Sequence, residues 1–234
     1  MFYIEEIRKS DMKKYIEKFK KLLEVSCYKT FILNLKYFGI KHIFKPLILV
    51  SKNTKILRMN GKVVVNKKDM GKIRIGFGSI GILDSKYNRA IWDNNGTIEF
   101  RGSAYLGIGA KISNSGYLTF GDGFCINANS DIVCMKSITF GDDVLVSWDT
   151  LFMNCDFHPI YQIDDFDKKR INDNKEIVVG DHCWIGCRCT LLKGTYIANN
   201  CIIAAGSTLT KEFKQENSVI SSKGIIKNNV TWMH

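Results

Sequence analysis

Apolar residues recur every six positions along much of this chain, a spacing that neither an α-helix nor an ordinary hairpin sheet produces. From Val179 the repeat continues without a miss to Leu209, and shorter runs precede it, one of them shifted by two residues. The apolar positions are Leu106, Ile112 and Leu118; Phe120, Ile126, Ile132 and Ile138; Phe140, Val146 and Phe152; and Val179, Ile185, Leu191, Ile197, Ile203 and Leu209. A fixed period of this kind indicates a solenoid.

Small residues fill two other slots of the hexapeptide. These are Gly180, Gly186, Ala198 and Ala204 directly after the apolar position, and Cys183, Cys189, Thr195, Cys201 and Ser207 four places after it. A short strand that turns a corner every six residues has room for one inward apolar side chain and needs small residues where the backbone bends. Three such strands complete a triangular coil, and stacked coils bury a shared apolar column. We therefore predict an all-β parallel helix of hexapeptides over residues 61–213.

The first 60 residues show no hexapeptide, and we treat residues 1–60 as a separate leader. Apolar residues at helical spacing predict an amphipathic helix over residues 4–26, with lysines on its opposite face. The leader can cap the open end of the solenoid, or it can present a basic, aromatic surface to an anionic membrane. Residues 214–234 are expected to form a C-terminal tail.

The formal charge of +11 is concentrated near the N-terminus. Residues 1–75 hold 19 Lys and Arg against 6 Asp and Glu, so the rest of the chain is slightly acidic. No nucleic-acid partner is expected, because the basic region contains no recognition motif.

Apolar residues make up 45% of the chain, which is enough to bury a substantial core. No apolar run is long enough to span a bilayer and no secretion signal is visible, so we expect a cytoplasmic protein. The eight cysteines are then free thiols, and the small-residue slot explains Cys183, Cys189 and Cys201 by packing. No metal site is expected.

The stretch FMNCDFHPIYQ, residues 152–162, interrupts the repeat. Counting six from Phe152 predicts that His158 occupies the next inward slot, while Pro159 breaks the strand, so residues 159–176 are expected to project as a loop. A histidine where a rigid scaffold meets a loop is well placed to act as a general base. Asp156 lies two residues earlier and could orient the imidazole or bind a sugar. The alternatives are a structural histidine that caps the loop and a carboxylate that only forms a turn.

The segment VVGDHCWIGCRCTLLKGTYIANNCIIAAGSTLTKEF and the motif NCDFHP resemble the hexapeptide-repeat acyltransferases, over about residues 73–213. Galactoside, maltose and polysaccharide O-acetyltransferases, including those of bacterial capsule and lipopolysaccharide, are of this family. The resemblance implies a left-handed β-helix, acetyl-CoA as acyl donor, and a homotrimer with active sites between subunits. It also implies that His158 deprotonates the acceptor hydroxyl, with Asp156 nearby.

The resemblance further implies a donor site along the C-terminal coils. Trp184, Cys187 and Ala205 match positions beside the pantetheine arm, and Thr210 and Lys211 match a pair near the nucleotide phosphates, where an ammonium group suits a polyanion. Asn129 matches an acceptor-binding asparagine, although asparagine is also common at coil corners because it tolerates left-handed backbone angles. Asn154 is a weaker acceptor-binding candidate.

Three functions fit these observations. The first is an acetyl-CoA-dependent O-acetyltransferase that acts on a bacterial surface polysaccharide or its precursor. The second is an N-acyltransferase that acts on an amino sugar, which an amine acceptor would distinguish. The third is a non-catalytic β-helix that serves as a binding or assembly module, although such a scaffold has no need of NCDFHP, Trp184 and GSTLTK together.

Overall fold

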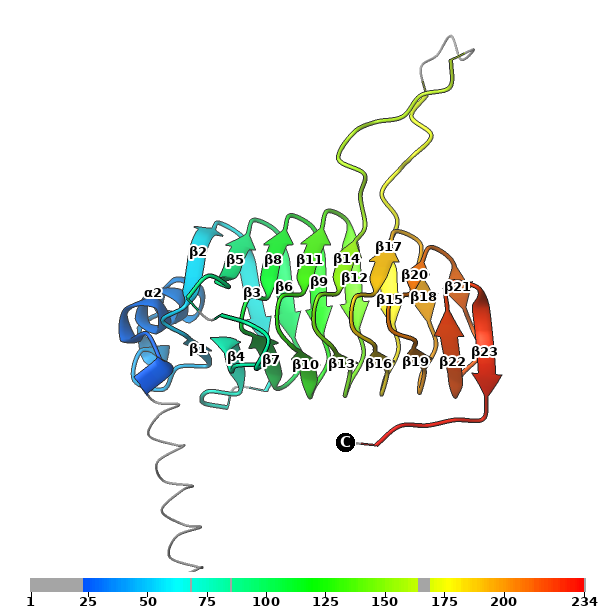
Figure 1. The fold of residues 1–234 in the computed structure, drawn as a ribbon. Helices are drawn as coiled ribbons and strands as arrows, with labels where there is room; N and C mark the ends of the chain where they lie inside the picture. The colour runs from blue at the N-terminus through cyan, green and yellow to red at the C-terminus, as the bar shows by residue number, and fades with distance from the viewer. Residues whose placement is uncertain (1–22, 68, 85, 164–168, 234) are drawn as a thin grey trace, which may run out of the picture.

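The computed structural model describes residues 23–67, 69–84, 86–163 and 169–233. The helix expected over residues 4–26 lies almost entirely outside this part of the chain. Within it, three parallel sheets wrap around one core, and successive strands go to successive sheets (Figure 1). This arrangement is the predicted left-handed parallel β-helix, whose three sheets form the faces of a triangular prism and are called sheets I, II and III below.

The strands of the three sheets have the following bounds. Sheet I contains β1 (Ile48–Val50), β4 (Ile73–Phe77), β7 (Ala104–Gly107), β10 (Phe124–Ile126), β13 (Leu145–Val146), β16 (Trp184–Ile185), β19 (Ile202–Ile203), β22 (Ser218–Ser221) and the antiparallel β23 (Gly224–Asn228). Sheet II contains β2 (Thr54–Met59), β5 (Ala90–Asn94), β8 (Lys111–Asn114), β11 (Asp131–Cys134), β14 (Leu151–Met153), β17 (Thr190–Leu192) and β20 (Thr208–Leu209). Sheet III contains β3 (Lys62–Val65), β6 (Thr97–Phe100), β9 (Tyr117–Phe120), β12 (Ser137–Phe140), β15 (Ile177–Val179), β18 (Tyr196–Ile197) and β21 (Glu212–Phe213).

The coils come in two lengths. In sheet II, Trp92 pairs with Ile112 and Ile112 with Ile132, so that stacked residues are 20 positions apart. Near the C-terminus, Val179 pairs with Ile197, 18 positions later. The strict six-residue period of the sequence therefore belongs to the C-terminal coils.

The longer coils explain the shift of two residues in the apolar series. Their strands in sheet III each hold two inward side chains, such as Ile138 and Phe140, and both of these are fully buried. The ring of Phe120 stacks on that of Phe140 at 5.7 Å, and Phe152 meets Phe140 edge to face at 4.9 Å. Burying each such side chain contributes roughly 1.5–3 kcal/mol.

The β-helix extends beyond the predicted range of residues 61–213 at both ends. The first coil already begins at Ile48, and β22 adds a strand after the last predicted hexapeptide. The repeat is hidden at the N-terminus because long connections follow Val65 and Phe77 and break the spacing of six.

Helix α2 (Cys27–Phe38) covers the N-terminal edge of sheet I and is followed by the short helix η1 (Ile40–His42). The Thr30 hydroxyl accepts a hydrogen bond from the Val50 backbone N–H (3.1 Å), and the Asn34 amide donates to the Ile48 carbonyl (2.7 Å). Backbone groups at a sheet edge would otherwise be unpaired. The helix thus caps the solenoid, and no helix in the described part of the chain is long and apolar enough to cross a bilayer.

A long loop projects from the corner between sheets II and III, where β14 ends at Met153 and β15 begins at Ile177 (Figure 1). The loop predicted at residues 159–176 forms most of this excursion. Its two arms run antiparallel near the base, where Tyr161 and Arg170 form an isolated bridge and the Ile171 N–H donates to the Ile160 carbonyl (2.9 Å).

Candidate active site

His158 lies at the base of the projecting loop with its side chain exposed. The prediction that it fills an inward slot of the coil is therefore wrong. Counting by six assumes that the chain stays in the coil after Phe152, but the chain turns the corner at Asn154 and then leaves. Within the described residues, neither nitrogen of the imidazole makes a hydrogen bond, which leaves both available to a ligand.

Asn154 forms the corner and does not face a ligand site. Its side chain is 0% exposed, its Oδ1 accepts from the Met135 N–H (2.7 Å), and its Nδ2 donates to the Ser137 carbonyl (3.0 Å). Asn114 holds the same corner two coils earlier, where its Nδ2 donates to the Thr97 carbonyl (3.1 Å). The interpretation of Asn154 as an acceptor-binding residue is corrected to a structural one.

Asp156 binds Lys193 and Asn172. Its Oδ2 accepts from the Lys193 ammonium and from Asn172 Nδ2 (2.7 Å), and among the described residues its carboxylate does not contact the imidazole of His158. The expectation that Asp156 orients the ring is therefore not met. The hydrogen bond from Lys193, with that from Asn172, lowers the pKa of Asp156 below its ordinary value, which keeps the carboxylate ionised.

Asn172 connects the two arms of the loop at its base. Its Nδ2 also donates to the His158 carbonyl (2.8 Å), and its Oδ1 accepts from the Ile160 N–H (2.7 Å) and Arg170 Nε (3.1 Å). The side chain is largely buried at 9% exposure. The backbone on both sides of Pro159 is therefore held by one amide.

The predicted pantetheine residues lie together on sheet I and at the corner between sheets I and II. Trp184 points outward from β16 with 38% of its surface exposed, and its indole N–H donates to Ser147 Oγ (3.2 Å). Cys187 and the exposed Ala205 occupy successive coils of that corner, where the Gly206 N–H donates to the Cys187 carbonyl (2.8 Å).

Glycine is needed beside these residues because the coils approach closely. A Cβ at Gly186 would lie 2.7 Å from the Ala205 backbone nitrogen, which is too close for any side chain. The small-residue slot thus reflects the tight corner, and Cys183, Cys189 and Cys201 are at most 1% exposed, as the packing interpretation predicts.

Asn129 lies at the corner between sheets I and II, nearer the N-terminus than Cys187. Its backbone is left-handed, with φ of 58°, as is that of Arg188 in a later coil of the same corner. The side chain is half-buried. The left-handed backbone at this corner explains why residue 129 is an asparagine. Asn129 lies on the same corner as Cys187, where it could also contact a ligand.

Thr210 and Lys211 are exposed at the corner between sheets II and III, in the connection from β20 to β21. The Lys211 ammonium lies 5.6 Å from the centroid of the Phe213 ring. This corner is the one from which the loop with His158 projects.

The site residues predicted from sequence thus form two groups on different edges of the prism. His158, Asp156, Thr210 and Lys211 belong to the corner between sheets II and III, whereas Trp184, Cys187, Ala205 and Asn129 belong to sheet I and its corner with sheet II. The corner between sheets II and III is the vertex opposite sheet I. One chain therefore does not bring His158 and the outward face of Trp184 together.

Three sites in the structure were not predicted: Asn172, Lys193 and the Trp232 tail. After β23 the tail folds back along sheet I (Figure 1), and the Trp232 indole stacks on His182 at 4.6 Å, 6.3 Å from the Trp184 ring. Asp143 Oδ2 lies 2.6 Å from His182 Nδ1. No sequence pattern indicates these contacts, because each joins segments that are distant along the chain.

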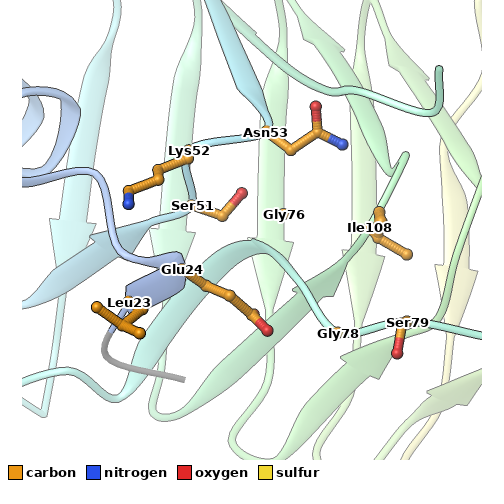
Figure 2. Close-up of a pocket in the computed structure, with 9 residues that line it drawn as sticks. All are labelled: Leu23, Glu24, Ser51, Lys52, Asn53, Gly76, Gly78, Ser79 and Ile108. Atoms are coloured by element: carbon orange, nitrogen blue, oxygen red, sulfur yellow. The ribbon is translucent and has the colours of Figure 1, made fainter. Parts of the chain in front are cut away.

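Cavities of about 300–320 Å³ lie away from the predicted residues. One of about 320 Å³ lies near the N-terminal coils, where Glu24 reaches from one wall toward Gly78 and Ser79 on the other (Figure 2). Another of about 320 Å³ is lined by Lys136, Glu176 and Tyr196. None of the predicted site residues lines either cavity. Among the described residues, no group of three or more His, Cys, Asp or Glu is arranged to hold a metal ion.

Comparisons with known proteins agree with this fold. The profile of the family described as "Bacterial transferase hexapeptide (six repeats)" matches residues 176–211. The solved structure of the polySia-specific acetyltransferase NeuO superimposes with a TM-score of 0.57 at 22% identity, covering 79% of this chain and 80% of that one. Residues 176–211 are thus similar to the hexapeptide-repeat transferases, and the fold is shared with a solved acetyltransferase.

Curated relatives in this family include sugar O-acetyltransferases. The polysialic acid O-acetyltransferase of Escherichia coli O1:K1 / APEC is 29% identical over 126 residues, which cover 53% of this chain and 38% of the relative. The enzyme of the same name from Neisseria meningitidis is 37% identical over 68 residues, which cover 29% of this chain and 31% of the relative. The chain thus matches less than half the length of these two relatives.

Proposed function

We propose that this protein is an acetyl-CoA-dependent O-acetyltransferase that transfers an acetyl group to a sugar hydroxyl of a bacterial surface polysaccharide or its precursor. The observation that carries the proposal is the exposed His158 at the base of the projecting loop, with both ring nitrogens unbonded within the described residues. The relatives named polysialic acid O-acetyltransferase support the class of acceptor.

In the proposed reaction, His158 accepts the proton of the acceptor hydroxyl while the hydroxyl oxygen attacks the thioester carbonyl of acetyl-CoA. The new C–O bond forms, the C–S bond breaks, and the proton passes from the imidazolium to the departing CoA thiolate. A backbone N–H stabilises the oxyanion of the tetrahedral intermediate. Asp156 takes no part in proton transfer, because its carboxylate is engaged by Lys193 and Asn172.

The donor would bind along the C-terminal coils. Trp184 offers an exposed ring face that its bond to Ser147 holds in one orientation, and the short side chain of Ala205 allows a pantetheine arm to approach the backbone. The exposed Lys211 ammonium and Thr210 hydroxyl suit phosphate groups, and because they lie on the corner of His158 they would reach the donor from the copy that supplies the base. Asn129, on the same corner as Cys187, would contact the acceptor.

The active site would form between subunits of a homotrimer. Because His158 and the Trp184 face lie on opposite sides of one prism, the base of one copy must meet the donor groove of another. Heterologous contacts between identical subunits can close into a ring, and a ring of three subunits is a trimer.

The test is acetyl transfer from acetyl-CoA to sialic acid-containing and neutral oligosaccharides, followed through release of free CoA thiol. We expect His158→Ala to lower turnover by about 10²–10⁴-fold with acetyl-CoA binding retained, and Trp184→Ala to weaken that binding in calorimetry. Near-normal turnover of His158→Ala would show that another group is the base. Failure of the wild-type protein to bind any acyl-CoA would exclude the transferase.

A further inference from the structure

We infer that Asn172 and Lys193 are positioning residues that hold the backbone of His158 in its reactive place, Asn172 by direct contact and Lys193 through Asp156 and Asn172. The inference rests on the proposed function, since it concerns the base of that reaction. It differs from the expected pairing of a carboxylate with the imidazole, because the contacts reach the backbone and leave the ring untouched.

Asn172 makes the direct contacts with the backbone around His158. Its Nδ2 donates to the His158 carbonyl (2.8 Å) and its Oδ1 accepts from the Ile160 N–H (2.7 Å), so one amide holds both peptide groups that flank Pro159. Asn172 belongs to the returning arm of the loop, 14 residues after His158. The two arms are therefore joined at the histidine itself.

Lys193 comes from the coil. Its ammonium donates to Asp156 Oδ2 and to the Asn172 carbonyl (3.1 Å), and its side chain is only 21% exposed. Lys193 directly follows β17, whose Leu192 pairs with Met153 at the end of β14. Strand pairing therefore fixes the lysine beside the point where the loop departs.

Together, the side chains of Asp156, Asn172 and Lys193 form a hydrogen-bond network that joins the coil to both arms of the loop. The carboxylate is at the centre of this network, because Asp156 Oδ2 accepts from both Lys193 and Asn172. A charge-assisted bond of this kind is roughly twice as strong as a neutral one. These contacts fix the position of the histidine backbone relative to the coil.

The experiment compares Asn172→Ala and Lys193→Met with Lys193→Arg, which retains a cation, and with Lys175→Met as the matched control. Lys175 is an exposed lysine on the same returning arm. Amide hydrogen exchange reports on the network without any substrate. We expect the Ile160 amide to exchange about tenfold faster in Asn172→Ala, because its acceptor is lost. Lys193→Met should also accelerate it, and Lys175→Met should leave it unchanged.

Kinetics supply the second readout. For Lys193→Met we expect kcat to fall by about a hundredfold, as misplacement of a catalytic group produces, with KM for acetyl-CoA and the melting temperature unchanged. Lys193→Arg should recover most of kcat. Unchanged exchange at Ile160 in both Asn172→Ala and Lys193→Met overturns the inference, and so does a fall in melting temperature that accounts for the loss of kcat. An inactive wild-type protein with altered exchange in the variants would instead reject the proposed function and leave the structural network standing.

Discussion

Apolar side chains are buried in the coils but exposed in the projecting loop. In the coils, Phe140, Phe152 and Ile185 are fully buried and recur at positions fixed by the stacking of strands. In the loop, Ile163 is 99% exposed, and Phe157, Ile160, Tyr161 and Ile171 are all about half exposed or more. The loop is thus held by a few polar contacts at its base and not by burial.

This difference separates the coils, which supply stability, from the loop that carries the proposed base. A coil gains its stability from neighbouring coils, as in any solenoid. Exposed apolar side chains grouped on one projecting segment mark a surface that another molecule covers. In the proposed trimer, a neighbouring subunit would cover this surface and bring its Trp184 to His158.

The largest effect should come from a cavity in the stack of phenylalanine rings. Phe140→Ala removes a ring in contact with Phe120, Phe124 and Phe152, and we expect it to lower the free energy of unfolding by about 3–5 kcal/mol. Ile163→Ala is the control from the loop and should change stability by less than about 0.5 kcal/mol. Denaturant titration measures both, and similar values for the two variants would contradict the comparison.

The second prediction tests whether base and donor groove come from different copies. His158→Ala and Trp184→Ala should each be nearly inactive at low acetyl-CoA, but co-expression in equal amounts should restore about a quarter of wild-type activity. In random closed rings, a quarter of the subunit contacts join an intact histidine to an intact tryptophan. No recovery in the mixed assembly would indicate that each site lies within one chain.

The fold could be predicted from sequence where the coils are short and regular. From Val179 to Leu209 each coil has 18 residues, so inward residues follow at intervals of six, whereas the 20-residue coils appeared only as broken runs. The first coil, from Ile48, was missed because long connections separate its strands from the next coil. The coils were thus predicted where the connections between strands are short and missed where these connections are long.

The candidate site was predictable in its residue types and not in its contacts. The motif NCDFHP located His158 and Asp156. Counting by six placed the histidine inside the coil, because the count does not show that the chain leaves the coil after Asn154. Asn172 and Lys193 reach Asp156 only because β14 stacks on β17 and because the loop folds back on itself. Neither event leaves a pattern in the sequence.

The corners give a prediction of intermediate size. Asn154→Ala leaves the Met135 N–H and the Ser137 carbonyl without their buried partner, and we expect a loss of about 1–3 kcal/mol. Asn129→Gly is the matched variant at an asparagine whose left-handed backbone glycine adopts freely, and it should cost less than about 0.5 kcal/mol. Equal losses would mean that both asparagines serve the same purpose.

The smallest effect should be a pH dependence of the C-terminal tail, which is attached to the coil by the stacking of Trp232 on His182 and by hydrogen bonds between the two residues. The hydrogen bond that Asp143 Oδ2 accepts from His182 Nδ1 raises the pKa of His182 above its ordinary value of 6.5, and the second ring nitrogen lies 3.1 Å from the Trp232 carbonyl. Both acceptors are satisfied at once only by the doubly protonated ring.

The stabilisation of the tail by His182 is therefore complete below about pH 6.5 and is lost as the pH rises through the raised pKa of His182. The part of the tryptophan fluorescence that Trp232→Phe removes should report the tail detaching at lower temperature as the pH increases from 6 to 9. Asp143→Asn removes the charge that raises the pKa, so it should shift this transition toward lower pH, and an unshifted transition would assign the pH dependence to another group.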